Sequence, residues 1–271
     1  MNSIKTQAII LRNRRFSETS LVATLLGRES GRLDVLAKGC RRDKSPMFGH
    51  LDLYQKEDVL VLRRPSAGLD LLIEAAFVDE HAGLRFLPSA FAAAGLLADF
   101  AAEATLPGEP VVGAYDVLAG AMGVLSGLGE AGSRAGLAES LPFNAAEKDI
   151  LVGRTLKLAL LDMLGWLGFG LELGRCVVCG NKVDADAKGL GLSSRQGGLV
   201  CGVCRKRCAD AVGIGPQALA SLRDRGDGGE GHELRLAKGE RRRWLHFLVD
   251  YCQHSLERPL RGRKVLFQLL G

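Results

Sequence analysis

The sequence predicts an α+β protein in which a small N-terminal β-barrel precedes a helical domain. Two observations give this class. The first 78 residues contain five short β-rich apolar runs separated by polar or glycine-bearing turns. From Asp79 onward the pattern changes to alanine- and leucine-rich segments of helical length. Five short strands in so short a stretch are typical of a small barrel, and an OB-fold is the natural candidate.

The strands of the predicted barrel follow one another closely. Polar or glycine-bearing turns at 13–19 and 27–31 separate the first three, and Pro65-Ser-Ala-Gly68 separates the last two. The expected strands cover residues 6–11, 20–26, 33–37, 59–62 and 69–73.

The helical domain is expected to begin at residue 79. Ser89 is the expected N-cap of its long alanine-rich helix. Glycine-rich stretches at 129–144 and 226–231 are expected to be a loop and a linker. The expected helices cover residues 81–87, 90–106, 111–128, 145–167, 215–223 and 239–257, the last resuming after Pro259. These patterns divide the chain into domains at 1–78 and 79–271, with a distinct module at 172–208 inside the second.

Four of the seven cysteines form the most specific chemical pattern in the chain, two Cys-x-x-Cys pairs separated by 21 residues. Two residues between thiolates let both sulfurs of a tight turn face one point, and two such pairs supply the four ligands of a tetrahedral Zn²⁺. Four thiolates leave no position for water, so one structural ion per chain is expected. Redox-active thiols are the alternative. The expected ligands are Cys176, Cys179, Cys201 and Cys204, with the nearby Cys208 interpreted as a bystander.

The net charge of +5 hides an asymmetry along the chain. Residues 1–64 carry a net charge of +6, residues 65–234 carry −7, and residues 235–271 carry +6. Two basic ends around an acidic middle would attract nucleic acid to the ends, although single runs of charge are more often solvated faces. The expected phosphate contacts are Arg28, Arg32, Lys38, Arg41, Arg42 and Lys44 near the N-terminus, and Arg261, Arg263 and Lys264 near the C-terminus.

No catalytic pattern stands out. The sequence has neither the P-loop form GxxxxGK[ST] nor an HExxH pair, so a non-enzymatic protein is expected. The N-terminus lacks the apolar stretch of a signal peptide, and the longest apolar region contains charged residues, so we expect a cytoplasmic protein without a membrane span.

Three ordered stretches resemble the RecO family of bacterial DNA repair and recombination proteins. They are Gln7-Ala-Ile-Ile-Leu-Arg12 with Ser17-Glu-Thr-Ser20, then Gly31-Arg-Leu-Asp-Val-Leu-Ala-Lys-Gly-Cys-Arg-Arg-Asp-Lys44, then Arg258-Pro-Leu-Arg-Gly-Arg-Lys-Val-Leu266. The cysteine quartet also lies where the zinc-bearing members of the family have theirs.

The resemblance implies an OB-fold followed by a helical domain with the zinc module. It also implies binding of single- and double-stranded DNA, annealing of complementary strands, and help in loading RecA onto strands coated with single-stranded-DNA-binding protein (SSB). RecR is the implied partner, RecF joins it in some organisms, and the location is the bacterial cytoplasm at the nucleoid.

Two features bear on how DNA and SSB would be held. Aromatic residues make up only 6% of the chain, and the candidates for base stacking in the barrel are Phe16, Phe48 and Tyr54, each of which core packing or a partner surface explains better. The acidic SSB tail needs a cation beside an apolar groove, which Arg154 and Lys157 on an apolar helix would supply, unless they are merely exposed charges.

The alternative function is a zinc-stabilised DNA-binding adaptor or transcription factor that reads sequence. Such a protein would need a recognition helix with arginine, asparagine or glutamine directed at base edges, and no such helix stands out. A nuclease would need clustered metal-binding carboxylates, which the sequence does not display.

Overall fold

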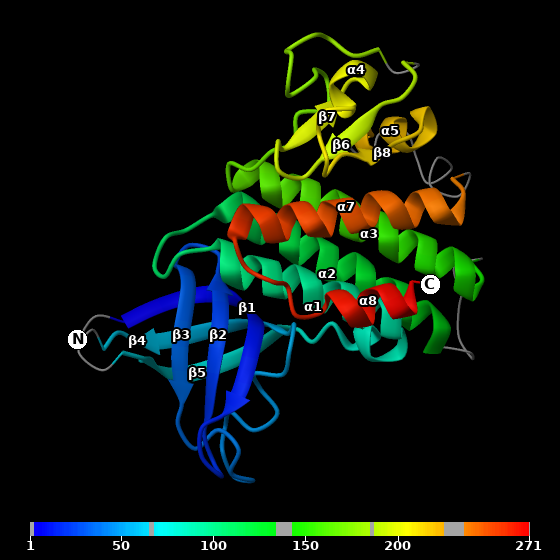
Figure 1. Ribbon diagram of the computed structural model, residues 1–271. Coiled ribbons are helices and arrows are strands. Elements are labelled where there is room, and N and C mark those ends of the chain that lie inside the picture. The colour runs from blue at the N-terminus through cyan, green and yellow to red at the C-terminus, as the bar shows by residue number, and fades with distance from the viewer. Residues whose placement is uncertain (1–2, 65–67, 134–142, 185–186, 225–235, 271) are drawn as a thin grey trace. The chain divides into compact units, whose positions relative to one another are not determined.

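The computed structural model describes residues 3–64, 68–133, 143–184, 187–224 and 236–270. The chain divides into two compact units, Met1–Leu137 and Ala138–Gly271. The first contains a barrel with helices after it, and the second contains helices and a small three-stranded sheet (Figure 1).

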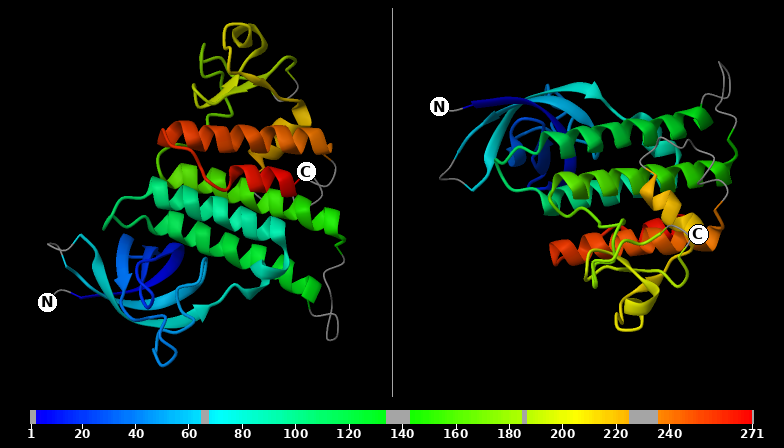
Figure 2. Two further views of the ribbon diagram at one scale, coloured as in Figure 1. Left: turned by 60° about the horizontal axis from the view of Figure 1, so that its bottom comes forward. Right: turned by 90° about the horizontal axis from the view of Figure 1, so that it is seen from above.

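Five strands close into a barrel in the order β1-β2-β3-β5-β4 (Figures 1 and 2). Neighbouring strands are antiparallel except β3 and β5, which are parallel. This closed five-stranded barrel is the OB-fold that the sequence predicts. The strands are β1 (Ser3–Arg15), β2 (Leu21–Gly27), β3 (Gly31–Ala37), β4 (Lys56–Leu62) and β5 (Asp70–Asp79).

The interior of the barrel is filled by side chains from every strand. Ile10, Leu25, Val35, Val61 and Leu72 are all buried in one apolar cluster. Successive residues of a strand point to opposite faces, so β3 alternates between buried and half-buried positions along its length. All five predicted strands are present.

Four strands are longer than predicted, namely β1, β3, β4 and β5, and β1 and β5 exceed their predicted lengths by the most. β5 continues to Asp79 because its pairing with β4 extends past Leu72, although most of the residues beyond it are exposed. β1 pairs with β2 up to Arg15, with an irregularity between Ile10 and Arg12. The apolar pattern ends before the backbone pairing does, so periodicity alone misses these ends.

The helical elements of the first unit are η2 (Ala82–Phe86), α1 (Pro88–Ala104) and α2 (Val112–Ser133). They match the predicted helices, but the predicted N-cap is wrong, because α1 begins at Pro88 and Ser89 lies inside it. Proline suits the first helical position because the N–H it lacks would have no helical partner there. Of the predicted loop at 129–144, residues up to Ser133 are helical, and 134–142 lie outside the described residues.

One helix of this unit is apolar and long enough to cross a membrane by length and composition. It is the stretch Val112–Glu130 of α2, half of which is buried. α2 packs against η2 and α1, so core packing explains its apolar character.

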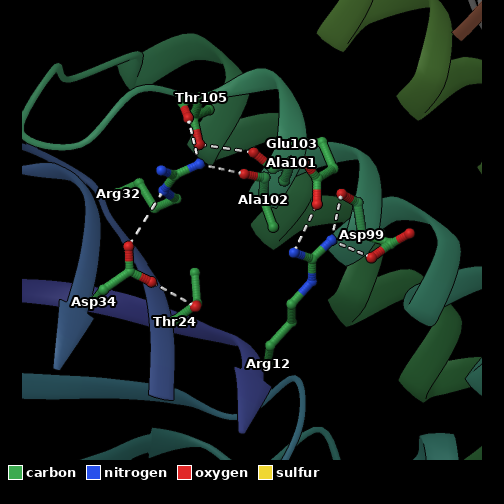
Figure 3. A network of polar contacts seen from close by, with 9 residues as sticks. All are labelled: Arg12, Thr24, Arg32, Asp34, Asp99, Ala101, Ala102, Glu103 and Thr105. Atoms are coloured by element: carbon green, nitrogen blue, oxygen red, sulfur yellow. Dashed lines mark hydrogen bonds and ion pairs between the residues drawn. The ribbon is translucent and has the colours of Figure 1, made fainter. Parts of the chain in front are cut away.

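Two arginines of the barrel bind α1 (Figure 3). Arg12 on β1 forms ion pairs with Asp99 and, at 2.8 Å, with Glu103. Burial lowers the pKa of Arg12, but its hydrogen bonds to Glu103 and Asp99 raise that pKa above the ordinary value. Arg32 on β3 donates to carbonyl oxygens at the end of the helix, those of Ala102 at 2.7 Å and Thr105 at 3.0 Å. Terminal carbonyls lack helical partners, so Arg32 satisfies groups that would otherwise go unpaired.

The second unit is built on the helices α3 (Ala145–Trp166), α5 (Pro216–Arg223), α7 (Lys238–Leu256) and α8 (Arg263–Leu269). Asn144 and Glu147 form a reciprocal capping box at the start of α3. α7 packs against α3 and α5 (Figure 2). The predicted helices are present here too, while the predicted linker at 226–231 lies outside the described residues.

A small module lies between α3 and α5 in sequence. Its sheet has the order β7-β6-β8, formed by β6 (Gly191–Ser193), β7 (Gly198–Val200) and β8 (Val212–Gly213), and it includes the short helix α4 (Gly202–Arg205). The hydroxyl of Tyr251 on α7 donates to the carbonyl oxygen of Phe169 at 2.9 Å, just before the module. The predicted domain boundary at residue 78 falls at the end of β5, not at the division between the compact units, and it stays a prediction.

Candidate metal centre and nucleic-acid surface

The first Cys-x-x-Cys pair forms a tight turn. The amide of Cys176 donates to the carbonyl oxygen of Asn181 at 2.9 Å, and the amide of Gly180 donates back to Cys176 at 2.8 Å. Gly180 has a φ of 74°, in the left-handed region that glycine adopts without strain. The turn is attached to β7 because the amide of Val177 donates to the carbonyl oxygen of Leu199 at 2.8 Å.

The second pair lies where β7 gives way to α4. Cys201 is the N-cap of α4, and Cys204 lies inside that helix. The amide of Cys201 donates to the Sγ of Cys176 at 3.3 Å, which links the two pairs directly. The small sheet therefore holds both turns on one side of the module.

The four sulfur atoms converge on one point. The Sγ atoms of Cys176, Cys179, Cys201 and Cys204 all lie within 4.8 Å of one another, and those of Cys179 and Cys201 are 3.9 Å apart. Tetrahedral zinc–thiolate bonds of about 2.3 Å place the sulfurs about 3.8 Å apart, so this donor set fits a tetrahedral metal ion. Cys208 is not part of the cluster.

Hydrogen bonding gives these thiols different acidities. Burial raises the pKa of Cys176, but amide donors, led by that of Cys201, offset it and bring the pKa down to about 6. Hydrogen bonding with neighbouring thiols, first with Cys201, raises the pKa of Cys204 to about 12. Adjacent thiolates repel one another, so four sulfurs this close favour a cation among them.

At the other candidate site, basic side chains lie on the segment that follows β3 in the barrel. Lys38, Arg42 and Lys44 are exposed, and among the described residues none of them forms an ion pair. Gly39, with a φ of 71°, turns the chain between them. Arg41 is half-buried and donates from Nη1 to the carbonyl oxygen of Glu18 at 3.0 Å. Exposed cations beside an open backbone can contact phosphates without reading bases.

Arg28 and Arg32 were predicted for the same surface, but the side chains of both contact other residues of the first unit. Arg28 makes two contacts with Asp116 on α2, from Nε at 2.8 Å and from Nη2 at 3.0 Å. The hydrogen bond from Arg28 lowers the pKa of Asp116. Arg32 binds the end of α1 as described above, so the donors of both guanidiniums are directed at the protein.

The C-terminal basic residues lie at or near α8 in the second unit. Arg263 forms an ion pair with Asp250 at 2.5 Å, and its guanidinium lies 5.9 Å from the ring centre of Phe267. Arg261 and Lys264 are exposed. Arg261 and Lys264 thus have exposed side chains, whereas the charge of Arg263 is paired within the unit.

The two residues predicted for the SSB tail differ in burial. Lys157 is only 1% exposed, and its Nζ donates to the carbonyl and hydroxyl oxygens of Ser221 at 2.8 and 3.1 Å. Its ammonium also lies 5.7 Å from the centre of the Trp244 ring. The charge of Lys157 is therefore used inside the unit, while Arg154 is half-buried.

A groove of about 150 Å³ lies between α3, α7 and α8. Lys238 and Arg242, both exposed, line it from α7. Trp244 also lines it, and the indole N–H of Trp244 has no hydrogen-bond partner among the described residues. The apolar side chains that line the groove are those of Ala146, Ile150, Trp244, Leu245, Phe267 and Leu270, and Asp149 and Arg241 line it as well.

Comparisons with known proteins agree with this architecture. The family model for the N-terminal part of recombination protein O matches residues 1–81, and the model for its C-terminal part matches residues 155–264. A DNA repair protein RecO of Rhodopirellula baltica is 30% identical over 80% of this chain and 73% of its own length. Those of Bifidobacterium adolescentis and Bifidobacterium longum are 26% and 29% identical, and each match covers at least 96% of both chains. The chain belongs to the RecO family.

Membership of the RecO family makes this a DNA repair protein. The structure also shows exposed cations that sequence reasoning missed. Arg14 and Arg15, at the end of β1, are exposed and precede the exposed Phe16. The sequence signal that could have found these two arginines is that they are adjacent. Lys238 and Arg242 at the groove were also missed, although they lie within or near the run Arg241-Arg242-Arg243.

Proposed function

We propose that this protein is a non-enzymatic mediator of recombinational DNA repair. It binds single- and double-stranded DNA, anneals complementary strands, and assists the loading of RecA on SSB-coated DNA together with RecR, and with RecF in some organisms. The observation that carries the proposal is membership of the RecO family combined with an exposed basic segment at one end of the OB-fold. A domain division at residue 78 and action in the bacterial cytoplasm at the nucleoid belong to the same proposal.

The proposed DNA contact is made by cations through phosphates. Lys38, Arg42 and Lys44 are exposed, and Arg41 fixes the segment that carries them. Such contacts do not depend on sequence, which suits annealing of any complementary pair. Arg28 and Arg32 support the barrel in this proposal, and Lys264 with Arg261 and Arg263 offers a second contact in the other unit.

The metal proposed for the cysteine cluster is one structural Zn²⁺ per chain. Four thiolate donors at these separations leave no open coordination position, which suits a structural role. The sheet around the cluster has strands of only two or three residues, too few to form a core of their own. Binding of the ion would therefore stabilise the module.

The groove between α3, α7 and α8 is proposed to hold the acidic SSB tail, in place of a site at Lys157. An apolar lining with exposed cations beside it suits an acidic peptide that ends in an aromatic residue. Arg154 adjoins Gly153, which lines the same groove.

Annealing of SSB-coated complementary oligonucleotides tests the proposed function. Without nucleotide, the protein should accelerate annealing of several unrelated sequence pairs to a similar degree. Equal rates with and without correctly folded protein would reject the mediator function. Strong dependence on one sequence would instead support an adaptor that reads bases.

A further inference from the structure

Phe16, Phe48 and Phe86 of the first unit are each more than half exposed, and the first two lie in turns of the barrel. Phe16, between β1 and β2, is 61% exposed, and Phe48, between β3 and β4, is 57% exposed. Tyr54 differs from both, because it is buried and its ring lies edge-on to that of Phe91 at 5.1 Å. Single exposed apolar side chains are ordinary on protein surfaces, so exposure alone assigns no function to these rings.

The segments that carry the two rings are joined to each other. The amide of Gly39 donates to the hydroxyl of Ser20 at 3.1 Å, and the amide of Arg41 donates to the carbonyl oxygen of Thr19 at 3.0 Å. Arg41 also donates from its side chain to Glu18 at 3.0 Å. The turn after β1 and the segment after β3 therefore form one surface at this end of the barrel.

Each ring stands on a turn that is itself held. The amide of Phe16 donates to the carbonyl oxygen of Ser20 at 3.0 Å, and the amide of Phe48 donates to that of Ser45 at 3.0 Å. Met47, next to Phe48, is buried in the barrel core. The rings are thus presented by fixed backbone, and little conformational entropy is lost when they bind a ligand.

Cationic residues precede each of the two rings in the sequence. Arg14 and Arg15 precede Phe16 directly, and Lys38, Arg42 and Lys44 precede Phe48; all five are exposed. Glu18, Asp43 and Asp52 are the exposed acidic residues of the same segments, and Asp52 is paired with Arg85. Aromatic faces among cations match a chain of alternating bases and phosphates.

We propose that Phe16 and Phe48 stack on unpaired bases, so that this end of the barrel prefers single-stranded nucleic acid to duplex. The inference rests on the proposed DNA-binding function and adds a specificity to it. A paired base has both faces covered by its neighbours, whereas an unpaired base can offer a face to a ring. Stacking occupies the face and leaves the pairing edge free, so a held strand can still find its complement.

The test compares the variant Phe16→Leu/Phe48→Leu with the wild type by fluorescence anisotropy. The ligands are a single strand, a duplex of the same length, and a single strand with abasic sites throughout. Stacking contributes about five- to 150-fold in affinity per base, so the variant should lose tenfold or more on the single strand and change little on duplex or abasic strand. Trp166→Leu, an exposed aromatic at the end of α3 in the other unit, is the matched control and should change none of the three.

A second variant keeps the stacking and reports on it. Phe48→Trp should retain single-strand affinity, and its added fluorescence should be quenched by the single strand but not by the abasic strand. Equal losses of the leucine variant on all three ligands, or no loss on any, would overturn the stacking inference and leave DNA binding intact; no loss would assign the rings to a protein partner. A wild type that binds neither strand nor duplex would overturn the proposed function itself.

Discussion

The ammonium of Lys157 on α3 donates to the carbonyl oxygen of Ser221 on α5 at 2.8 Å, inside the second unit. The side chain is buried, so it acts as an internal link between two helices. The sequence alone does not distinguish a cation that supports the fold from a cation that receives an acidic peptide. This contact assigns Lys157 to the first kind.

Replacing Lys157 by alanine should destabilise the protein. The change removes the hydrogen bonds that Lys157 donates to Ser221 and removes buried volume, so we expect a loss of about 2–4 kcal/mol in the free energy of unfolding. Chemical denaturation measures it. Lys238→Ala/Arg242→Ala should leave stability unchanged and weaken binding of an SSB-tail peptide about tenfold. A folded Lys157→Met variant that alone loses the peptide would contradict the proposed groove.

The cysteine cluster should hold one equivalent of zinc in freshly purified protein. Cys201→Ser removes a thiolate donor and should lower the zinc content well below one equivalent and destabilise the module. Elemental analysis gives the content. Cys208→Ser is the matched control, because Cys208 lies close in sequence but outside the cluster. Equal zinc loss in both variants would assign the metal elsewhere.

The exposed cations after β3 should govern the salt dependence of DNA binding. Lys38→Ala/Arg42→Ala should weaken binding to all sequences about equally and flatten the slope of log affinity against log salt by about 1–2 units, because fewer counterions are released. Lys5→Ala/Arg64→Ala, which also removes two exposed cations of the barrel unit, should have a smaller effect. Identical slopes for the two double variants would refute a localised contact.

Arg32 should affect stability more than DNA binding. Arg32→Met leaves two carbonyl oxygens at the end of α1 without their donor, at a cost of about 1–3 kcal/mol. The salt slope of DNA binding should stay that of the wild type. A stable variant with a flatter slope would restore Arg32 as a phosphate contact.

Glu57 should make stability depend on pH on the acidic side. Its side chain is fully buried at the barrel end, where Oε1 accepts from the amide of Leu51 at 3.0 Å and Oε2 lies 3.4 Å from Nδ1 of His50. Burial raises its pKa above 4.5, so the folded protein holds this proton to a higher pH than the unfolded chain. Stability from this group is therefore present below the unfolded pKa and is lost as pH rises through the folded value.

The side chain in Glu57→Gln does not titrate, so the variant should not lose stability in this way as pH rises. The difference in unfolding free energy between Glu57→Gln and the wild type should move in favour of the variant as pH rises from the unfolded pKa of Glu57. Denaturation at a series of pH values measures it. A difference that is constant with pH would show that Glu57 does not titrate differently on folding.

Much of the fold was predictable because its signals are local. Strand and helix positions follow from periodicity and turn residues, and the cysteine cluster follows from two short spacings. The functions of Arg32 and Lys157 were not predictable in this way. Arg32 binds the carbonyl oxygen of Ala102, 70 residues away, and Lys157 binds Ser221, 64 residues away. The sequence does not show whether a cationic side chain is exposed to solvent or donates to a distant carbonyl oxygen.

The exposure of Phe16 and Phe48 was not predictable from the sequence either. Composition predicted that Phe16 and Phe48 were core or partner surface, and the low aromatic content gave no reason to separate them from Tyr54. Their positions differ because Tyr54 lies against α1, at Phe91, whereas Phe16 and Phe48 are largely exposed in turns of the barrel. Only the packing of α1 on the barrel distinguishes these residues.

The closure of the barrel has a consequence for how the chain folds. β1 pairs with β2 nearby, but its other edge pairs with β4, so that Ser3 lies opposite Leu62. During synthesis that edge stays open until β4 has left the ribosome, and β5 must follow before the ring is complete. Contacts this distant in sequence slow folding and expose unpaired strand edges meanwhile. We therefore expect the first unit to be most prone to aggregation while it is being made.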